Sequence, residues 1–356
     1  MTARQQRTTP TVAIIGAGIS GLAAAHTLSD AGANVTIYEK SHAVGGRAVT
    51  RRHNGYVYDY GAQYVKEGSP EIMALITERF RTPDLFDIAK PVWTFTGQNE
   101  IQEGNPQLNA ERKISYHDGL SALCKQMAKG LHIAFETFIT HIEQHDDTWD
   151  LFDTCGHVYG SFDAAIISIP VPQASSLINN SPLHDTPLQA QAVELLETGS
   201  YNPLISVMLG YASRPRLRDY YALVNTDKQH AISWLAWEHE KGPERTPPGA
   251  GLLIAQMAPQ YSQEHLNTPP ATLYADVAQQ VATLIDEDLP APTFTDHYYW
   301  RFALPKDKVD KEALNTLAIP RRLAFCGDGF VGGRLHLALE HGTIVAQQLI
   351  DAHFKT

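Results

Sequence analysis

The sequence predicts an α/β fold with two domains, in which a sheet-rich α+β domain is inserted into a domain built on a parallel sheet. Near each end of the chain, a short apolar run leads through a glycine-rich turn into a helix. This pattern is typical of a buried parallel strand followed by its helix. Residues 187–288 differ, because longer strand-like runs there alternate with proline-rich loops. A chain of 356 residues also exceeds one average domain.

The first element is the run "VAII" at residues 12–15, which reads as a buried strand. Gly16 allows a tight turn after it, Gly18 leaves the backbone open to a phosphate, and Gly21 lets the next helix pack closely. The helix start offers N–H groups and the positive end of its dipole to an anion. The residues that we predict to bind a dinucleotide pyrophosphate are Gly16, Ala17, Gly18, Ile19, Ser20 and Gly21.

The second strand, "NVTIY", is followed by Glu39 and Lys40. An acid roughly 20 residues after the first glycine is placed to accept hydrogen bonds from ribose hydroxyls. It also argues against a 2′-phosphate on this ribose. The next segment, "GGRAVT", brings Gly46 and Arg47, which predict a second contact with the pyrophosphate through a forked, charge-assisted interaction.

The following elements are predicted from their periodicity. We expect helices at residues 70–79, 117–131 and 271–286, a strand at 90–97, and an antiparallel meander that leads to a buried strand at 164–169. From residue 293 the chain returns to the pattern of its first part, a strand followed by a glycine-rich loop and a helix. This return implies a discontinuous nucleotide-binding domain. Its predicted segments are 1–72, 113–185 and 290–356, and the inserted substrate domain comprises 73–112 and 186–289.

The C-terminal stretch "LAFCGDGFVGGR" places Asp328 in a glycine-rich loop between a strand and a helix. An aspartate there suits ribitol or ribose hydroxyls. The helix that begins near Arg334 would direct its positive end at an electron-rich ring edge. In a flavin that edge is N1 and the C2 carbonyl, where negative charge accumulates on reduction.

Composition excludes several classes of function. A net charge of −11 argues against general nucleic-acid binding. Three dispersed cysteines give no disulfide framework, and the sixteen histidines are scattered along the chain, so no metal site is expected. No apolar run is long enough to span a bilayer, and the first ten residues lack the apolar segment of a signal peptide. We therefore expect a cytoplasmic protein without membrane or nucleic-acid partners.

Several motifs together resemble the renalase branch of the flavin amine oxidase superfamily. They are "VAIIGAGISGL", "GGRAVT", "YDYGAQY", "FDAAIISIPVPQA", "YYWRFALP" and "FCGDGFVGGR". The resemblance implies a Rossmann-type FAD-binding domain of the p-hydroxybenzoate-hydroxylase-like fold. It implies non-covalent FAD, because the Ser-Gly-Gly-Cys attachment stretch of covalent relatives is missing. His341 stands where relatives often have serine.

The resemblance also implies roles for single residues. Ile139 would supply backbone contacts to the adenine, and Ala62 and Gln63 would lie beside the isoalloxazine ring. The ribitol and the pyrimidine edge of the flavin would meet Asp328, Gly333 and Arg334.

The expected reaction is hydride transfer from a small substrate to flavin N5, followed by reduction of O₂ to H₂O₂. The resemblance points to oxidation of isomeric dihydronicotinamide dinucleotides. Candidate pocket residues are Tyr64, Trp234, Trp300 and Arg301, whereas Trp237 belongs either to the pocket wall or to the core. Two alternatives stay open. One is an amine oxidase or desaturase on the same scaffold, and the other is a flavin-binding protein without catalytic activity.

Overall fold

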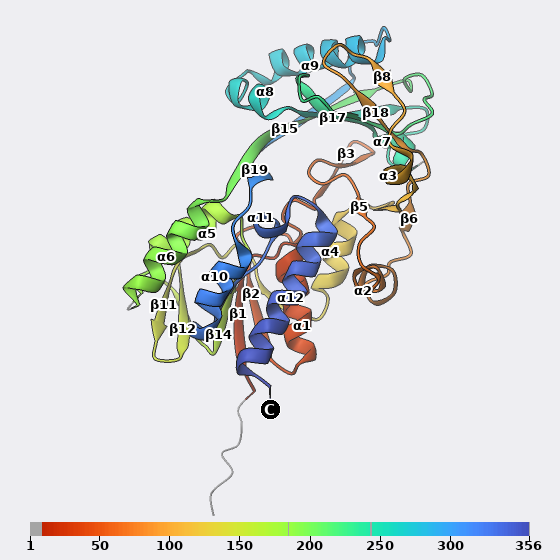
Figure 1. Cartoon of the computed structure of the whole chain (residues 1–356). Coiled ribbons are helices and arrows are strands. Elements are labelled where there is room, and N and C mark those ends of the chain that lie inside the picture. Colours follow the sequence, from red (N-terminus) through yellow and green to blue (C-terminus); the bar gives the residue numbers. More distant parts are fainter. Residues whose placement is uncertain (1–8, 184, 243, 356) are drawn as a thin grey trace, which may run out of the picture. The chain divides into compact units, whose positions relative to one another are not determined.

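The computed structural model describes residues 9–183, 185–242 and 244–355, and the chain forms two compact units (Figure 1). The first unit comprises the residues up to 46, 124–200 and those from 305 onward, and the second comprises 47–123 and 201–304. Residues 47–72 and 113–123, expected in the nucleotide-binding domain, cluster with the second unit. The reason is strand pairing, since β9 (Lys113–Tyr116) pairs with both β5 (Val65–Lys66) and β6 (Leu85–Asp87).

The first unit is built on a five-stranded parallel sheet with the order β10-β2-β1-β14-β20. The strands are β1 (Thr11–Ile15), β2 (Asn34–Tyr38), β10 (His132–Ala134), β14 (Ala164–Ile167) and β20 (Leu323–Phe325). The central residues Val12, Ala13 and Ile14 are completely buried. The unbroken apolar run therefore correctly predicted a strand that is covered on both faces.

Two helices from opposite ends of the chain lie side by side in this unit, α1 (Ile19–Asp30) and α12 (Leu335–His353) (Figure 1). A Cβ atom on Gly342 would lie 2.1 Å from the carbonyl oxygen of Ser20, so glycine is required where the helices approach most closely. Further helices of the unit are α4 (Ser121–Ala128), which begins in the second unit, α5 (Val171–Asn179), α6 (Thr186–Glu197) and α10 (Lys311–Ala318).

The predicted meander is confirmed as a separate antiparallel sheet in the first unit. It consists of β11 (Ile139–His145), β12 (Thr148–Asp153) and β13 (Val158–Phe162), with β12 in the middle. Trp149 and Leu151 are fully buried, whereas their neighbours on β12 are only partly buried, which is the alternation expected of a sheet with one covered face.

The second unit contains a seven-stranded sheet with the order β19-β15-β18-β17-β16-β7-β8. Its strands are β7 (Val92–Phe95), β8 (Ile101–Gln102), β15 (Ser200–Tyr211), β16 (Ala222–Asn225), β17 (Ile232–Trp237), β18 (Gly251–Met257) and β19 (Phe294–Asp307). One face packs on α9 (Pro270–Ile285), where Trp237 and Leu253 meet Val277. The other face packs on the hairpin β3 (Thr50–His53) and β4 (Tyr56–Asp59).

The predicted helix at 70–79 is present as α2 (Pro70–Ala74) continued by a π-helical turn (Leu75–Arg79). Short helices complete the second unit, namely α3 (Pro106–Ala110), α7 (Glu238–Lys241) and α8 (Pro259–Glu264). Among the described residues, no helix is both long enough and apolar enough to cross a membrane.

Candidate functional site

The predicted pyrophosphate-binding residues lie in the turn between β1 and α1. Gly18 is the N-cap of α1, and no side chain in the described part of the chain caps this helix. A Cβ on Gly21 would lie 2.2 Å from the carbonyl oxygen of Gly16, so the turn cannot close with a larger residue there. A Cβ on Gly18 would meet no atom within 4 Å, so this side of the turn is open. Uncapped helix N–H groups beside an open backbone suit a phosphate.

Glu39 links this turn to the end of β2. Its side chain is buried, and Oε2 accepts a hydrogen bond of 2.8 Å from the N–H of Ala17. Oε1 accepts one of 2.9 Å from the N–H of Ser41. An ionised carboxylate has about four lone-pair sites, so these two bonds leave acceptor capacity for hydroxyl groups. The neighbouring Lys40 is exposed.

The second glycine turn contacts the first. Gly18 and Gly45 form a bridge, and a Cβ on Gly46 would lie 3.6 Å from the Cα of Gly18. The next residue, Arg47, belongs to the second unit. Its Nη1 donates to the carbonyl oxygens of Phe302 at 3.0 Å and Ala303 at 3.3 Å, so the guanidinium is anchored on β19.

The C-terminal segment departs from the expected loop. Asp328, which is 9% exposed, begins a short helix, α11 (Asp328–Val331), before the chain reaches Gly333 and Arg334. Both of these residues are exposed, and Arg334 is the N-cap of α12. The prediction of a plain loop was therefore wrong, because its glycines flank a helical turn instead of preventing one.

His341 on α12 contacts this segment. Its Nδ1 lies 3.2 Å from both the backbone nitrogen and the carbonyl oxygen of Gly327, the residue before Asp328. Burial lowers the pKa of His341 to about 4, so the ring is neutral at pH 7. The side chain therefore fastens α12 to the start of the glycine-rich segment.

Ile139 lies at the start of β11, where it is buried and pairs with Asp153 of β12. It belongs to the first unit, as do the glycine turns, Glu39 and Asp328.

In the second unit, the predicted residues Ala62 and Gln63 lie in the turn after β4. The N–H of Ala62 donates to the carbonyl oxygen of Arg47 at 3.0 Å. The Gln63 amide donates to the carbonyl oxygens of Asp59 at 2.6 Å and Gly61 at 3.2 Å. Its oxygen accepts from Nζ of Lys241 at 3.0 Å. These contacts hold the side chain of Gln63 in one orientation.

Lys241 belongs to a buried ionic cluster that the sequence analysis missed. We use the name ionic cluster for Asp59, Glu238, Lys241 and Arg245, whose side chains are all 0% exposed. Nη1 of Arg245 binds Asp59 Oδ2 at 2.7 Å and also contacts Glu238, and Lys241 Nζ lies 2.8 Å from Glu238 Oε2.

Burial would raise the pKa of Asp59, but the two cations outweigh it and hold that pKa below its ordinary value. With two carboxylates and two cations, the ionic cluster is neutral overall. The segment "EHEKGPER" gave no sequence signal for burial, because a run of charged residues is typical of a solvated surface.

The predicted aromatic residues form two groups in the second unit. Tyr64 lies against Trp234, with ring centroids 6.1 Å apart. Trp300 stacks on Tyr60 with centroids 5.5 Å apart, and its Nε1 donates to the carbonyl oxygen of that residue at 2.9 Å. Trp237 is 1% exposed in the core under α9, which settles its role as packing.

Arg301 does not share a face with Trp300. Adjacent residues of a strand point to opposite sides of the sheet, and Arg301 is exposed. On the side of Arg301, His297 of the same strand bonds to Tyr274 of α9. The two residues therefore do not line one pocket wall together.

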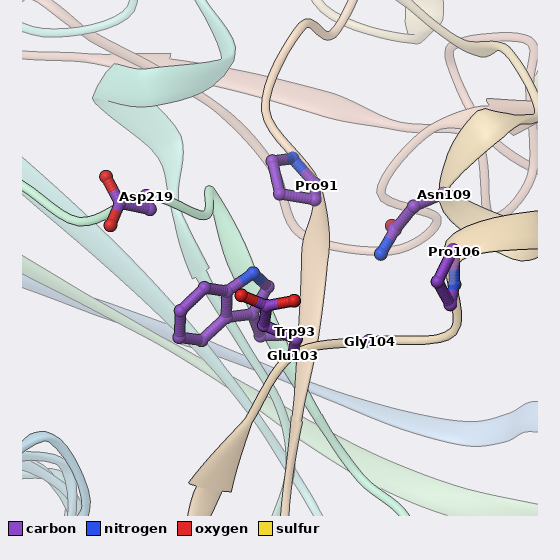
Figure 2. A pocket seen from close by; sticks show the side chains of 7 residues that line it. All are labelled: Pro91, Trp93, Glu103, Gly104, Pro106, Asn109 and Asp219. Carbon is purple, nitrogen blue, oxygen red and sulfur yellow. The ribbon is translucent and has the colours of Figure 1, made fainter.

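A surface pocket of ≈ 290 Å³ lies at the edge of the sheet formed by β7 and β8 (Figure 2). Its lining residues are Pro91, Trp93, Glu103, Gly104, Pro106, Asn109 and Asp219. None of them is a predicted site residue. The opposite edge of the sheet is β19, which carries Trp300, so this pocket is separate from the predicted site.

Two family descriptions match the chain. A "NAD(P)-binding Rossmann-like domain" matches residues 14–79, and "Flavin containing amine oxidoreductase" matches residues 90–350. Among curated proteins, a 67-residue segment is 43% identical to protoporphyrinogen oxidase 2 of Arabidopsis thaliana, and this segment covers 19% of the chain and 13% of that protein. A segment of 109 residues is 37% identical to amine oxidase [flavin-containing] B of Cavia porcellus. This segment covers 30% of the chain and 21% of that protein. The matched segments thus span a small part of these relatives.

Among solved structures, a reduced UDP-galactopyranose mutase superposes with a TM-score of 0.78 at 14% identity, covering 98% of this chain and 97% of that one. At such identity the likeness shows the fold alone. The family match covers most of the chain, and with the Rossmann-like match it identifies an FAD-dependent oxidoreductase. The chain belongs to the flavin containing amine oxidoreductase family.

Proposed function

We propose that this enzyme is an oxidase that removes a hydride from an isomeric dihydronicotinamide dinucleotide, as renalase-like enzymes do, and that O₂ is the final electron acceptor. When bound, FAD accepts the hydride at N5 and supplies the electrons that convert O₂ to H₂O₂. The observation that carries the proposal is the set of motifs that resemble the renalase branch, namely "YDYGAQY", "IPVPQA" and "WRFALP".

The residues proposed to bind the ADP half of FAD are Gly16 to Gly21, Glu39, Lys40, Gly46, Arg47 and Ile139. The open face at Gly18 fits a pyrophosphate, since a Cβ there would occupy space that no protein atom fills. Glu39 retains acceptor capacity for the ribose hydroxyls. Arg47, whose Nη1 binds the backbone of β19, would contribute a charged guanidinium, a group whose fork of N–H donors matches phosphate oxygens.

The residues proposed for the flavin half are Ala62, Gln63, Asp328, Gly333 and Arg334. The orientation of Gln63 is fixed by three hydrogen bonds, so its amide would present the same atoms to the ring in every turnover. The helix α12 directs the N–H groups of its first turn toward the space beyond Arg334.

We propose that Tyr64, Trp234 and Trp300 form the walls of the substrate site. Their role is to orient a flat ring and to exclude water, and no protein nucleophile is needed for hydride removal. Arg301 is left out of this wall, because it lies on the other face of β19. We also propose non-covalent FAD and a cytoplasmic location, the latter supported by three cysteines without disulfides.

Amine oxidation is a second candidate. It is favoured by the aromatic pair Tyr64 and Trp234, which is the kind of surface that binds an amine, and by the family match itself. The ionic cluster does not favour either substrate, because its carboxylates are already paired with Lys241 and Arg245.

Anaerobic mixing distinguishes these candidates. The FAD-loaded protein is mixed with isomers of reduced NAD(P), with the ordinary reduced forms and with putrescine, and the flavin absorbance is followed. The proposal expects rapid bleaching by the isomers, and one H₂O₂ per substrate after O₂ is admitted. Bleaching by putrescine alone would establish the second candidate. A flavin that stays oxidised with every nicotinamide would end the leading proposal.

A further inference from the structure

The turn that joins β12 to β13 gathers three side chains of the types that bind transition metals. Asp153, Cys155 and His157 lie at alternate positions of the segment "DTCGH". Their potential ligand atoms all lie within 4.8 Å of one another. The expectation of no metal site rested on how the histidines are scattered, so it did not cover a mixed set with one histidine.

The carboxylate of Asp153 is held in place by the backbone of the turn. Oδ1 accepts hydrogen bonds from the N–H groups of Cys155 at 2.8 Å and His157 at 3.0 Å. Oδ2 therefore faces the imidazole, and it lies 3.0 Å from Nδ1 of His157. The hydroxyl of Tyr159 donates to the same oxygen at 3.0 Å. Supporting contacts of this kind orient the ligands of metal sites.

Capping of the turn explains only part of this arrangement. The two backbone bonds to Oδ1 account for an aspartate at position 153, as in other turns that begin with this residue. These bonds use only the backbone N–H groups of Cys155 and His157, so they do not explain the side chains at these positions. Both side chains are exposed to solvent. The thiol and the imidazole beside a fixed carboxylate need a separate reason.

We propose that Asp153, Cys155 and His157 form a binding site for one zinc ion or a similar borderline-soft divalent metal. Thiolate, imidazole and carboxylate are ligands that zinc accepts, whereas magnesium and calcium prefer oxygen ligands alone. Three protein ligands leave one tetrahedral position for water. Binding releases the proton of the Cys155 thiol, and the ion replaces the hydrogen bond between His157 and Asp153.

Cobalt titration of the full-length, untagged protein tests this site. Co²⁺ is expected to bind at one ion per chain and to produce the thiolate-to-cobalt absorption band in the near ultraviolet, and Zn²⁺ is expected to abolish the band. Cys155 is the exposed member of the three cysteines, all of which lie in the described part of the chain. Zn²⁺ should therefore protect one thiol from iodoacetamide in the folded protein.

Variants separate the site from adventitious binding. Cys155→Ser should remove the band and weaken Zn²⁺ binding by more than about a hundredfold, exceeding the effect of losing a supporting residue. Asp153→Asn keeps an oxygen that can cap the turn, so it should weaken binding while the melting temperature stays unchanged. His145→Ala removes an exposed histidine at the end of β11 and should leave binding intact. Stoichiometric binding that survives in Cys155→Ser, or absence of the band in the unmodified protein, would overturn the proposal.

Discussion

In the first unit the turn after β1 depends on close approach between backbone atoms, whereas in the second unit the turn that contains Gln63 is also supported by charged side chains in the interior. The turn after β1 depends on glycines at van der Waals distance from other backbone atoms. The turn that contains Gln63 depends instead on Lys241, and through it on Asp59, Glu238 and Arg245. The first arrangement is sensitive to a Cβ atom added at Gly16 or Gly21, and the second is sensitive to the loss of a charge.

Arg245→Met should have the largest effect, because it leaves Asp59 and Glu238 buried with one cation between them. We expect the free energy of unfolding to fall by about 3–5 kcal/mol, as for other broken buried ion pairs. Urea denaturation measures this loss. The matched control is Arg52→Met, which breaks an exposed pair with Asp118 and should cost about 0–1 kcal/mol. Equal losses in the two variants would show that burial gives the ionic cluster no special role in the stability of the second unit.

Gly18→Ala tests the first unit, because it adds a methyl group to the turn after β1. A Cβ there meets no protein atom, and the backbone φ of −70° suits alanine, so apoprotein stability should stay within about 0.5 kcal/mol. The methyl group would occupy the space proposed for the pyrophosphate, and FAD affinity should fall by more than about tenfold, or 1.4 kcal/mol. Flavin fluorescence titration measures the affinity, and Ser29→Ala on exposed α1 surface serves as control. Unchanged FAD affinity would contradict the assignment.

His341→Gln tests a side chain that supports the main chain of the first unit. Burial, together with Lys311, lowers the pKa of His341 to about 4, against about 6.5 when unfolded. The unfolded chain therefore takes up the proton first, and stability is lost as the pH falls from about 6.5 toward 4. At pH 5.5 this loss amounts to about 1 kcal/mol. Between pH 7.5 and 5.5 the free energy of unfolding should change less in the variant than in the unmodified protein. An identical change in both proteins would disprove the lowered pKa of His341.

Arg301→Ala should have the smallest effect. The side chain is exposed on the face of β19 away from Trp300, so kcat/KM should change by less than about twofold. Trp300→Leu removes the stacking on Tyr60 and should lower kcat/KM by about tenfold. Steady-state kinetics with the best substrate measures both. A large effect of Arg301→Ala would return this residue to the substrate site.

The contrast between the units also explains what the sequence could predict. The turn from Gly16 to Gly21 and its partner Glu39 lie close together in the chain, and each has a local physical reason for its residue type. The ionic cluster joins Asp59 to Arg245 across 186 residues, and nothing local marks either charge as buried. Its pairing depends on how distant strands meet, which periodicity does not encode.

Three further differences separate the prediction from the structure, and the first two have local causes. The stretch "YYWRFALP" carries large side chains on both faces of β19, so it lacks the alternation that would have assigned Trp300 and Arg301 to opposite sides. The stretch "GDGFVGG" reads as a loop because of its glycines, although a single helical turn fits between Gly327 and Gly332. Helix α6, within residues expected to belong to the inserted domain, packs on α5 and α10 of the first unit.

The pairing of α1 with α12 has a consequence for biosynthesis. These helices are neighbours in the fold, yet α1 leaves the ribosome when nearly the whole chain is still to be made, and β20 arrives equally late. At 5–20 residues per second, α1 waits roughly 15–60 s for its partner. During translation α1 can pack on β1 and β2, but its contact with α12 forms only after that helix emerges.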